Sequence, residues 1–526
     1  MSRINTNVAS QIAQRVLTSN SKTLNTTLER LSTGLRINRG KDDPAGLIAS
    51  ENLRGEKTAL SAAIGNAERT DQLANIAEGG LQEVSGLLTE LQGLITATAN
   101  SAGLSQEEKQ ANQLQIDSIL QTVDRIADAT NFQGVKLLNG NFDFRTSAVS
   151  GGITSFNVNG AKLAKGGSIV VQALVTTSAQ QAAVFLSTNG NVNLNGSNTG
   201  LFTIEVTGTL GSRELSFASG ATQEAIIAAV NTFTDVTGVK AGFFTSASSN
   251  FLRLQSSEFG KDSFVSVKVV NDAGIGTAGG IGVFRARDGG TTPDADQPDT
   301  AGTVQTFNGT AAKNGVRDAG QDIAVTINGV SATTKGRNAR INTDFLDVDI
   351  TFNTSTATTR GLVGGSTGAL SIIGGGAEFQ LASRVDIAGK VAIGIQDVSA
   401  RRLGGIETGS GGSNSLRFLS DLAAGKLLNV VNGDLAGAQK VVSEAIRQVS
   451  STRGRLGAFQ KNTVGATIRS LNISLENSSA AESVIRDADF ASETASLTRS
   501  QILQSASTNV LGLANQAPQS ALQLLR

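Results

Sequence analysis

Apolar residues repeat every seven positions near both ends of the chain, and this repeat constrains the fold more than any other feature of the sequence. One series runs from Leu53 to Ile95, and another from Leu428 to Leu456. A seven-residue period places side chains on one narrow stripe of a long α-helix, which another helix must cover. We therefore expect rod-like helix packing at Leu53, Leu60, Ala67, Ala74, Leu81, Leu88, Ile95, Val442, Val449 and Leu456.

The outermost segments also carry apolar stripes, one in residues 17–35 and one in residues 502–524. Fixing a residue costs about 1–2 kcal/mol of backbone entropy, whereas burial of a Leu side chain returns roughly 1.5–3 kcal/mol. We therefore expect these segments to be disordered in the free monomer and to fold by packing on each other and on neighbouring copies; an intramolecular coiled coil is the alternative. The expected interface positions are Leu17, Leu24, Leu28, Leu31, Leu35, Ile502, Ala506, Val510, Leu513, Ala517, Ala521 and Leu524.

Three local signals mark where long helices begin. Asp43-Pro44 supplies an N-cap residue followed by proline at the first helical position. Ser105 and Glu108 have the spacing of a capping box. Gly433-Asp434 interrupts the C-terminal repeat, and we expect it to cap the longer helix that follows.

The middle of the chain has a different composition. Most of the 21 Phe residues fall between Phe156 and Phe379, in a stretch rich in Gly, Thr, Asn and Val. Alternating runs such as residues 201–206 and 264–270 predict β-strands separated by turns. The sequence therefore predicts a multidomain α+β protein. Its long N- and C-terminal helices pair in a coiled-coil-like manner, and β-rich domains are inserted between them.

Composition excludes several classes of function. The chain has no Cys, His, Trp or Tyr, and its 44 basic residues equal its 44 acidic residues. Without His or Cys, ordinary zinc sites, disulfides and Ser-His-Asp or Cys-His catalysis are not available. Balanced charge argues against nucleic-acid binding, and the lack of a long apolar run argues against a signal peptide or membrane insertion. We expect no enzyme activity and no cofactor.

Two weaker motifs occur in the middle region. Gly274–Gly279 matches the glycine spacing of a dinucleotide site, but the following residues predict a strand where a phosphate site needs a helix start. We therefore expect a turn there. Asp294, Asp296 and Asp299 lie in a Pro-containing loop without the spacing of an EF-hand, so we expect a solvated loop and leave cation binding open.

Five segments resemble the terminal signatures of bacterial flagellins: Leu28–Leu47, Thr130–Gly140, Ala481–Phe490, Gln501–Ser507 and Ala514–Gln519. The resemblance implies a structural subunit that self-assembles into an extracellular helical filament for swimming, with the paired termini as its innermost tube. It also implies export of the unfolded chain through the flagellar type III apparatus with an export chaperone. The implied partners are further copies of the chain and the flagellar cap and hook-junction proteins.

The resemblance also implies a domain order. Residues 1–43 and 488–526 would form the filament core, and residues 44–148 and 412–487 the helical rod with a β-hairpin. Residues 149–411 would form a surface-exposed insertion of two subdomains, 149–290 and 291–411. The residues expected to join core and rod are Arg30, Arg36, Asp42, Asp43, Arg486, Asp487 and Asp489.

Two other functions stay open at this point. A hook–filament junction protein shares these terminal signatures but occupies one short zone, so abundance would separate it from a filament subunit. A flagellin whose central domains add adhesion is the other alternative. Catalytic insertions known in the family resemble zinc metalloproteases, whose H-E-x-x-H site needs histidines that this chain lacks.

Overall fold

The structure is a computed structural model, and it describes residues 6–100, 103–164, 167–188, 192, 200–246, 249–275, 280–287, 297–299, 304–408 and 415–524. The chain divides into two compact units. The first consists of Met1–Gly79, Phe379–Val391 and Arg453–Arg526. The second consists of Gly80–Glu378 and Ala392–Thr452.

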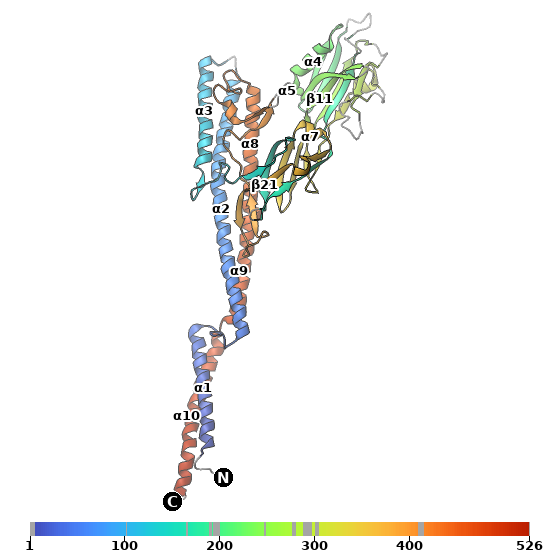
Figure 1. The fold of residues 1–526 in the computed structure, drawn as a ribbon. Helices are drawn as coiled ribbons and strands as arrows, with labels where there is room; N and C mark the ends of the chain where they lie inside the picture. Colours follow the sequence, from blue (N-terminus) through green and yellow to red (C-terminus); the bar gives the residue numbers. More distant parts are fainter. Residues whose placement is uncertain are drawn as a thin grey trace. The chain divides into compact units, whose positions relative to one another are not determined.

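The first unit is almost entirely helical. Its helices are α1 (Val8–Thr33), the first part of α2 (Pro44–Thr98), the last part of α8 (Leu435–Ala458), the π-helix η4 (Phe459–Val464), α9 (Gly465–Arg486) and α10 (Phe490–Leu524). Helices α1 and α10 come from opposite ends of the sequence and lie side by side, antiparallel, as Figure 1 shows in blue and red. The predicted pairing of the two chain ends is therefore present within one chain.

The start signals of the long helices are confirmed. Helix α2 begins at Pro44, and the Asp43 side chain accepts a hydrogen bond from the N–H of Gly46 at 2.9 Å. Helix α3 (Gln106–Ala129) begins with the capping box of Ser105 and Glu108. Helix α8 (Leu435–Ala458) follows Asp434, whose side chain accepts from the N–H of Gly437 at 3.0 Å.

The ten rod-packing positions expected on α2 and α8 are buried or half-buried. Leu53 is half-buried, and the other nine expected positions are at most 4% exposed. The structure then departs from the seven-residue series, which would continue from Leu456 to Thr463. Val464 is fully buried instead, because the π-helical turn η4 contains one more residue per turn than an α-helix and moves the buried stripe by one position.

The helical part of the second unit holds its loops through polar side chains of α3. Gln113 is 4% exposed; its amide donates to the carbonyl of Leu422 and accepts from the N–H of Val430, both at 2.9 Å. The hairpin of β1 (Asn131–Phe132) and β2 (Val135–Lys136) follows α3. A Cβ atom on Gly80 of α2 would lie 2.6 Å from the hydroxyl of Thr130, so this helix position needs a glycine.

The β-rich region forms two subdomains, each with its own core. One contains the sheets β17-β18-β19-β4, β16-β15-β6-β20 and β3-β21-β5, and the other contains β10-β11-β7-β13 and β14-β12-β8-β9. Helix α4 (Gln223–Thr232) packs on the second subdomain, whose core includes Phe202 and Phe307 with ring centroids 5.0 Å apart.

The strands of the first subdomain are β3 (Phe144–Ser147), β4 (Ile153–Ala161), β5 (Ile169–Val171), β6 (Ala173–Thr177), β15 (Ala324–Ile327), β16 (Val330–Ser331), β17 (Thr333–Lys335), β18 (Asn338–Asn342), β19 (Leu346–Phe352), β20 (Gly361–Val363) and β21 (Leu370–Gly375). Those of the second are β7 (Gln181–Ser187), β8 (Phe202–Gly208), β9 (Ser212–Phe217), β10 (Val239–Ser246), β11 (Ser249–Phe259), β12 (Phe264–Asn271), β13 (Gly282–Arg285) and β14 (Val316–Ala319). The short elements are α5 (Thr234–Thr237), α6 (Thr310–Asn314), α7 (Thr354–Thr358), η2 (Gly365–Thr367), η3 (Leu419–Leu422), β22 (Ala377–Gln380), β23 (Lys390–Ile393), β24 (Ile406–Thr408) and β25 (Ser415–Arg417).

The expected division of this region into 149–290 and 291–411 is wrong. Strand β4 pairs with β19 and strand β6 pairs with β15, so the first subdomain is built from segments on both sides of the second. The chain leaves it after β6, forms β7 to β14, and returns at β15. Antiparallel pairing between distant segments decides the boundary, and single-strand patterns do not contain that information.

The described residues include only parts of the two weaker motifs. The strand β13 follows the glycine motif, as predicted, although residues 276–279 of the motif lie outside the described residues. Asp294 and Asp296 also lie outside them, so the loop is not tested. The part of the chain that the structure describes contains no cluster of metal-ligating side chains and no helix that could span a membrane.

Candidate interface of the terminal helices

Polar side chains, rather than leucines, make the specific contacts between α1 and α10. The amide of Asn7 donates to the carbonyl of Ala514 at 2.7 Å, and the hydroxyl of Ser10 donates to the side chain of Asn515 at 2.6 Å. Further along the pair, the amide of Asn20 donates to the hydroxyl of Ser507, also at 2.6 Å. The first two bonds join the start of α1 to the end part of α10, and the third joins the middle of the two helices.

The buried residues of the pair are small. Among the side chains of α1 and α10 that the structure describes, the buried ones are Ala13, Thr27, Ser500 and Ser507. Small residues allow the two helix backbones to approach closely, but they remove little apolar area from water. The contact within one chain is therefore close and weakly hydrophobic.

The expected interface residues divide into two groups. On α1, Leu17, Leu24, Leu31 and the following Leu35 are half-buried, whereas Leu28 is exposed. On α10, Ile502, Val510 and Leu513 are 64%, 54% and 67% exposed, and Ala506 is exposed as well. The side chains of Ala517, Ala521 and Leu524 lie outside those described.

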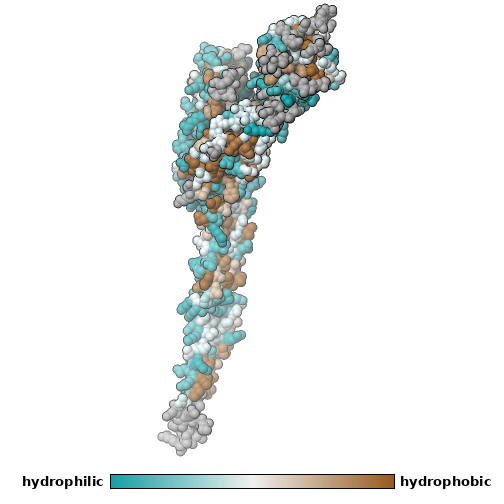
Figure 2. All heavy atoms as spheres, turned by 45° about the vertical axis from the view of Figure 1, so that its right-hand side comes forward, coloured by the Kyte–Doolittle hydropathy of each residue, from teal (hydrophilic) through white to brown (hydrophobic). Residues whose placement is uncertain are grey.

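The apolar stripe of α10 therefore does not face α1 in this structure. At about 100° per residue, the stripe of Ile502, Val510 and Leu513 lies roughly a third of a turn away from Ser500 and Ser507, which face α1. Apolar surface accordingly reaches the outside of the terminal helices, where Figure 2 shows brown residues among teal ones. Polar contacts to α1, of which the three described above are the shortest, accompany this orientation of α10.

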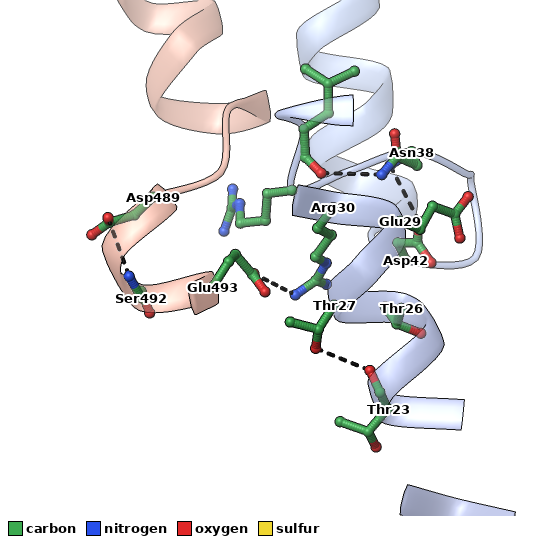
Figure 3. Close-up of polar contacts among 12 residues, drawn as sticks. Thr23, Thr26, Thr27, Glu29, Arg30, Asn38, Asp42, Asp489, Ser492 and Glu493 are labelled. Carbon is green, nitrogen blue, oxygen red and sulfur yellow. Dashed lines mark hydrogen bonds and ion pairs between the residues drawn. The ribbon is translucent and has the colours of Figure 1, made fainter. Parts of the chain in front are cut away.

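A dense set of contacts lies where α1 is followed by α2 and where α10 is preceded by α9, within the first unit (Figure 3). The guanidinium of Arg30 pairs with Glu493 at 3.2 Å, and the carboxylate of Glu493 is 14% exposed. Glu493 is the sole acidic residue between Phe490 and the C-terminus, so α10 offers Arg30 one possible carboxylate. The ion pair thus fixes which part of α10 lies beside the end of α1.

Backbone hydrogen bonds complete this junction. The N–H of Arg36 donates to the carbonyl of Arg486 at 2.7 Å, and the N–H of Ala488 donates to the carbonyl of Gly34 at 2.9 Å. These two bonds flank an antiparallel bridge between Leu35 and Asp487. The side chain of Arg36 also donates to the carbonyl of Ile485 at 3.2 Å.

The acidic junction residues order the turns. Asp42 accepts from the N–H groups of Arg39 and Asn38 at 2.9 and 3.2 Å, and the Arg39 hydrogen bond is the main cause that lowers the pKa of Asp42 below its usual value. Asp43 caps α2, and Asp489 caps α10 through the N–H of Ala491 at 2.9 Å. The junction residues expected from the sequence therefore lie together.

Asp487 and Arg486 complete the set with partners on α9 and α2. Asp487 accepts from the hydroxyl of Ser483 at 2.6 Å, and Arg486 pairs with Glu51 of α2 at 3.1 Å. Glu51, Glu493 and the pair Lys57–Glu482, which is 2.7 Å long, were missed by sequence reasoning. Charged residues are so frequent on helix surfaces that pattern alone does not select these partners.

Asn7, Ser10, Asn20 and Ser507 were missed as well. Asn20 lies midway between Leu17 and Leu24, at a position of the helix face that turns toward α10. A polar residue inside a leucine repeat is a known signal for a position that specifies helix pairing, and it could have identified Asn20.

Comparisons with known proteins agree at both ends of the chain and along its length. The family model for the bacterial flagellin N-terminal helical region matches residues 4–143, and that for the C-terminal helical region matches residues 439–525. The B-type flagellin of Pseudomonas aeruginosa is 30% identical over 549 aligned positions, which cover 99% of each chain. A flagellin of Salmonella choleraesuis is 27% identical with the same coverage.

A solved structure of FliC from Burkholderia pseudomallei matches 74% of this chain and 99% of that one at 13% identity, with a TM-score of 0.24, which is too low to support an argument. The sequence relationship does not depend on it. The identity to the Pseudomonas protein extends over essentially the whole length of both chains, including the terminal helices, the rod and the β-rich insertion. The chain therefore belongs to the bacterial flagellin family, whose members are structural subunits of the extracellular flagellar filament.

Proposed function

We propose that this flagellin polymerises through the outward stripe of its terminal helix pair. The observation that carries the proposal is the exposure of Ile502, Val510 and Leu513 on a pair that buries small residues between its own helices. Burial of each such side chain is worth roughly 1.5–3 kcal/mol. Contiguous exposed apolar surface of this kind marks an interaction site in soluble proteins.

The half-buried leucines of α1 belong to the same interface. Leu17, Leu24 and Leu31 are half-buried and retain surface for a further contact. We include Leu28, Leu35, Ala506, Ala517, Ala521 and Leu524 because their spacing continues the two stripes. The rod seam of α2 and α8 supports this division, since it is covered by its own chain whereas the stripe of α10 is exposed.

The junction around Arg30 and Glu493 has a mechanical role in the proposal. It connects the terminal pair to the rod through an ion pair, two backbone hydrogen bonds and the capping residues Asp43 and Asp489. A connection with several short polar contacts transmits the orientation of the rod to the terminal pair. Subunits that dock by their rods would then present their terminal stripes at a fixed angle.

The remaining assignments follow from family membership. The β-rich insertion, residues 149–411, faces outward from the filament, with 44–148 and 412–487 as the rod and 1–43 and 488–526 as the core. The partners are further copies of the chain, the cap and hook-junction proteins, and an export chaperone for the type III apparatus. The role is structural and includes no catalytic step or cofactor.

Thiol labelling tests the proposed interface directly, because the chain contains no cysteine of its own. Val510→Cys is expected to react with a maleimide in the free chain and to lose most of that reactivity in the polymer. Glu224→Cys, on an exposed position of α4, serves as the matched control and stays reactive in both states. Equal labelling of Val510→Cys before and after polymerisation would contradict the proposal.

A further inference from the structure

The rotation of α10 about its own axis differs from the one that hydrophobic burial alone favours. If α10 rolled by roughly a third of a turn, Ile502 and Val510 would pack against the half-buried Leu17 and Leu24 of α1. That arrangement would bury large aliphatic side chains in place of serines. In the structure α10 instead presents Ser500 and Ser507 to α1.

Hydrogen bonds at one end and in the middle of the pair explain the observed orientation. We define the polar ladder as Asn7, Ser10, Asn20, Ser507 and Asn515, which form side-chain bonds of 2.6–2.7 Å across the two helices. The rolled arrangement would break each of these bonds and would leave the amide groups of Asn7 and Asn20 between the helices. An unpaired polar group in such a position costs more than a typical hydrogen bond contributes.

We propose that the polar ladder is a facing lock, which holds the stripe of Ile502, Val510 and Leu513 outward so that a second copy of this chain can cover it. The inference rests on the proposed function and extends it, because it names the residues that decide which face of the pair is presented. Polar residues in an otherwise apolar helix seam specify pairing geometry at the expense of stability, which is the role assigned to the ladder.

The occupant is a second copy because the stripe consists of neutral aliphatic side chains on a chain whose family forms homopolymers. Residues 494–526 contain no acidic residue, and the nearest basic residue to the stripe, Arg499, is exposed. A charged partner would find few groups to pair with on this face. An apolar helix face of another copy matches its chemistry.

Two cysteine pairs distinguish the two orientations. Ser21→Cys with Gln504→Cys reports the observed one, since these side chains contact each other across the two helices and lie outside the polar ladder. Leu24→Cys with Ile502→Cys reports the rolled one, in which a disulfide becomes possible only when the stripe turns inward. Each double variant is oxidised both as the free chain and after co-assembly with a large excess of the cysteine-free parent, so that the disulfides counted lie within one chain.

The ladder is then removed in each cysteine background by Asn7→Ala, Asn20→Ala and Ser507→Ala. We expect the yield of the Leu24→Cys/Ile502→Cys disulfide, relative to the other pair, to rise at least about fivefold, as the net loss of one hydrogen bond predicts. Thr18→Ala is the matched control, since its hydroxyl bonds to Gln14 within α1 and is exposed. It is expected to retain the parental ratio.

An unchanged disulfide ratio in the ladder variant would overturn the facing lock, even if the parent polymerises normally. If the triple variant does not co-assemble, the single substitution Ser507→Ala is compared in the filament and must shift the ratio in the same direction. Failure of the cysteine-free parent to polymerise would instead contradict the proposed function. The two failures are therefore distinguishable.

Discussion

The rod and the terminal pair use the same helical repeat for opposite purposes. In the rod, Leu81, Leu88 and Ile95 are at most 1% exposed, because other parts of the same chain cover them. In the terminal pair, Ile502, Val510 and Leu513 are more than half exposed although their spacing is equally regular. A heptad repeat therefore identifies a helix face that needs a partner. The residues at the contact between the two helices decide whether that partner lies in the same chain.

Single-residue deletions give the largest expected effect on the rod side of this comparison. Deletion of Ser451, which is exposed in a regular turn of α8, turns Leu456 and Phe459 away from the seam. We expect the unfolding free energy to fall by more than about 2–5 kcal/mol, which is the usual loss when one large core side chain is truncated to Ala. Urea unfolding of the free chain measures this change.

Deletion of Thr463 is the matched control, because η4 already contains one residue more than an α-helical turn needs. The residues after it retain their positions when the π-helical turn becomes α-helical. The expected loss is limited to the contacts of Gln460 with Asn75 and Asp71. Equal destabilisation by the two deletions would show that the π turn does not absorb a register difference.

Matched Leu→Ala substitutions compare the two regions side by side. Leu88→Ala removes a fully buried side chain and is expected to lower the unfolding free energy of the free chain by about 2–5 kcal/mol. Leu513→Ala is expected to change it by less than about 0.5 kcal/mol, as for other exposed positions.

The order reverses for assembly. Leu513→Ala is expected to raise the critical concentration for polymerisation roughly tenfold, which corresponds to about 1.4 kcal/mol per subunit. Sedimentation of polymer over a range of protein concentrations gives this value. A critical concentration equal to that of the parent would remove Leu513 from the interface.

A smaller effect is expected at the junction of the two regions. Glu493→Gln removes the charge that pairs with Arg30, whose Nε atom is buried without a hydrogen-bond partner. We expect a destabilisation of up to about 1 kcal/mol, which is seen as an approximately fivefold higher critical concentration. Glu29→Gln is the control, since the pair Glu29–Arg39 is more exposed and is expected to matter less.

The smallest effect is a pH dependence that originates in Asp42. Its pKa is lowered from 3.8, chiefly by the hydrogen bond from Arg39, so the ionised form stabilises the folded turn. This contribution is complete above the unfolded pKa and is lost as the pH falls through the lower folded pKa. Asp42→Asn is therefore expected to flatten the acid limb of the melting temperature below about pH 4. A parallel curve for variant and parent would show that Asp42 does not contribute.

Much of the helical architecture could be predicted from local sequence. The start of α2 at Pro44, the capping box of α3 and the break before α8 each depend on a few adjacent residues, and all are confirmed. The junction residues were selected by resemblance, and the structure places them together. Their partners Glu51 and Glu493 could not be selected, because ion pairing depends on which helices lie side by side.

The sequence by itself determined that this chain has long paired helices at its ends and β-rich domains between them. It also determined that the chain lacks the His and Cys side chains of ordinary zinc sites and thiol chemistry. Periodicity and composition suffice for these conclusions because they are properties of neighbouring residues. The tertiary structure alone decided that one β subdomain is inserted in the other, that the seam shifts at Val464, and that the stripe of α10 faces outward. Each of these depends on contacts between segments distant in sequence, where a hydrogen bond such as that from Asn20 to Ser507 can prevail over a hydrophobic stripe.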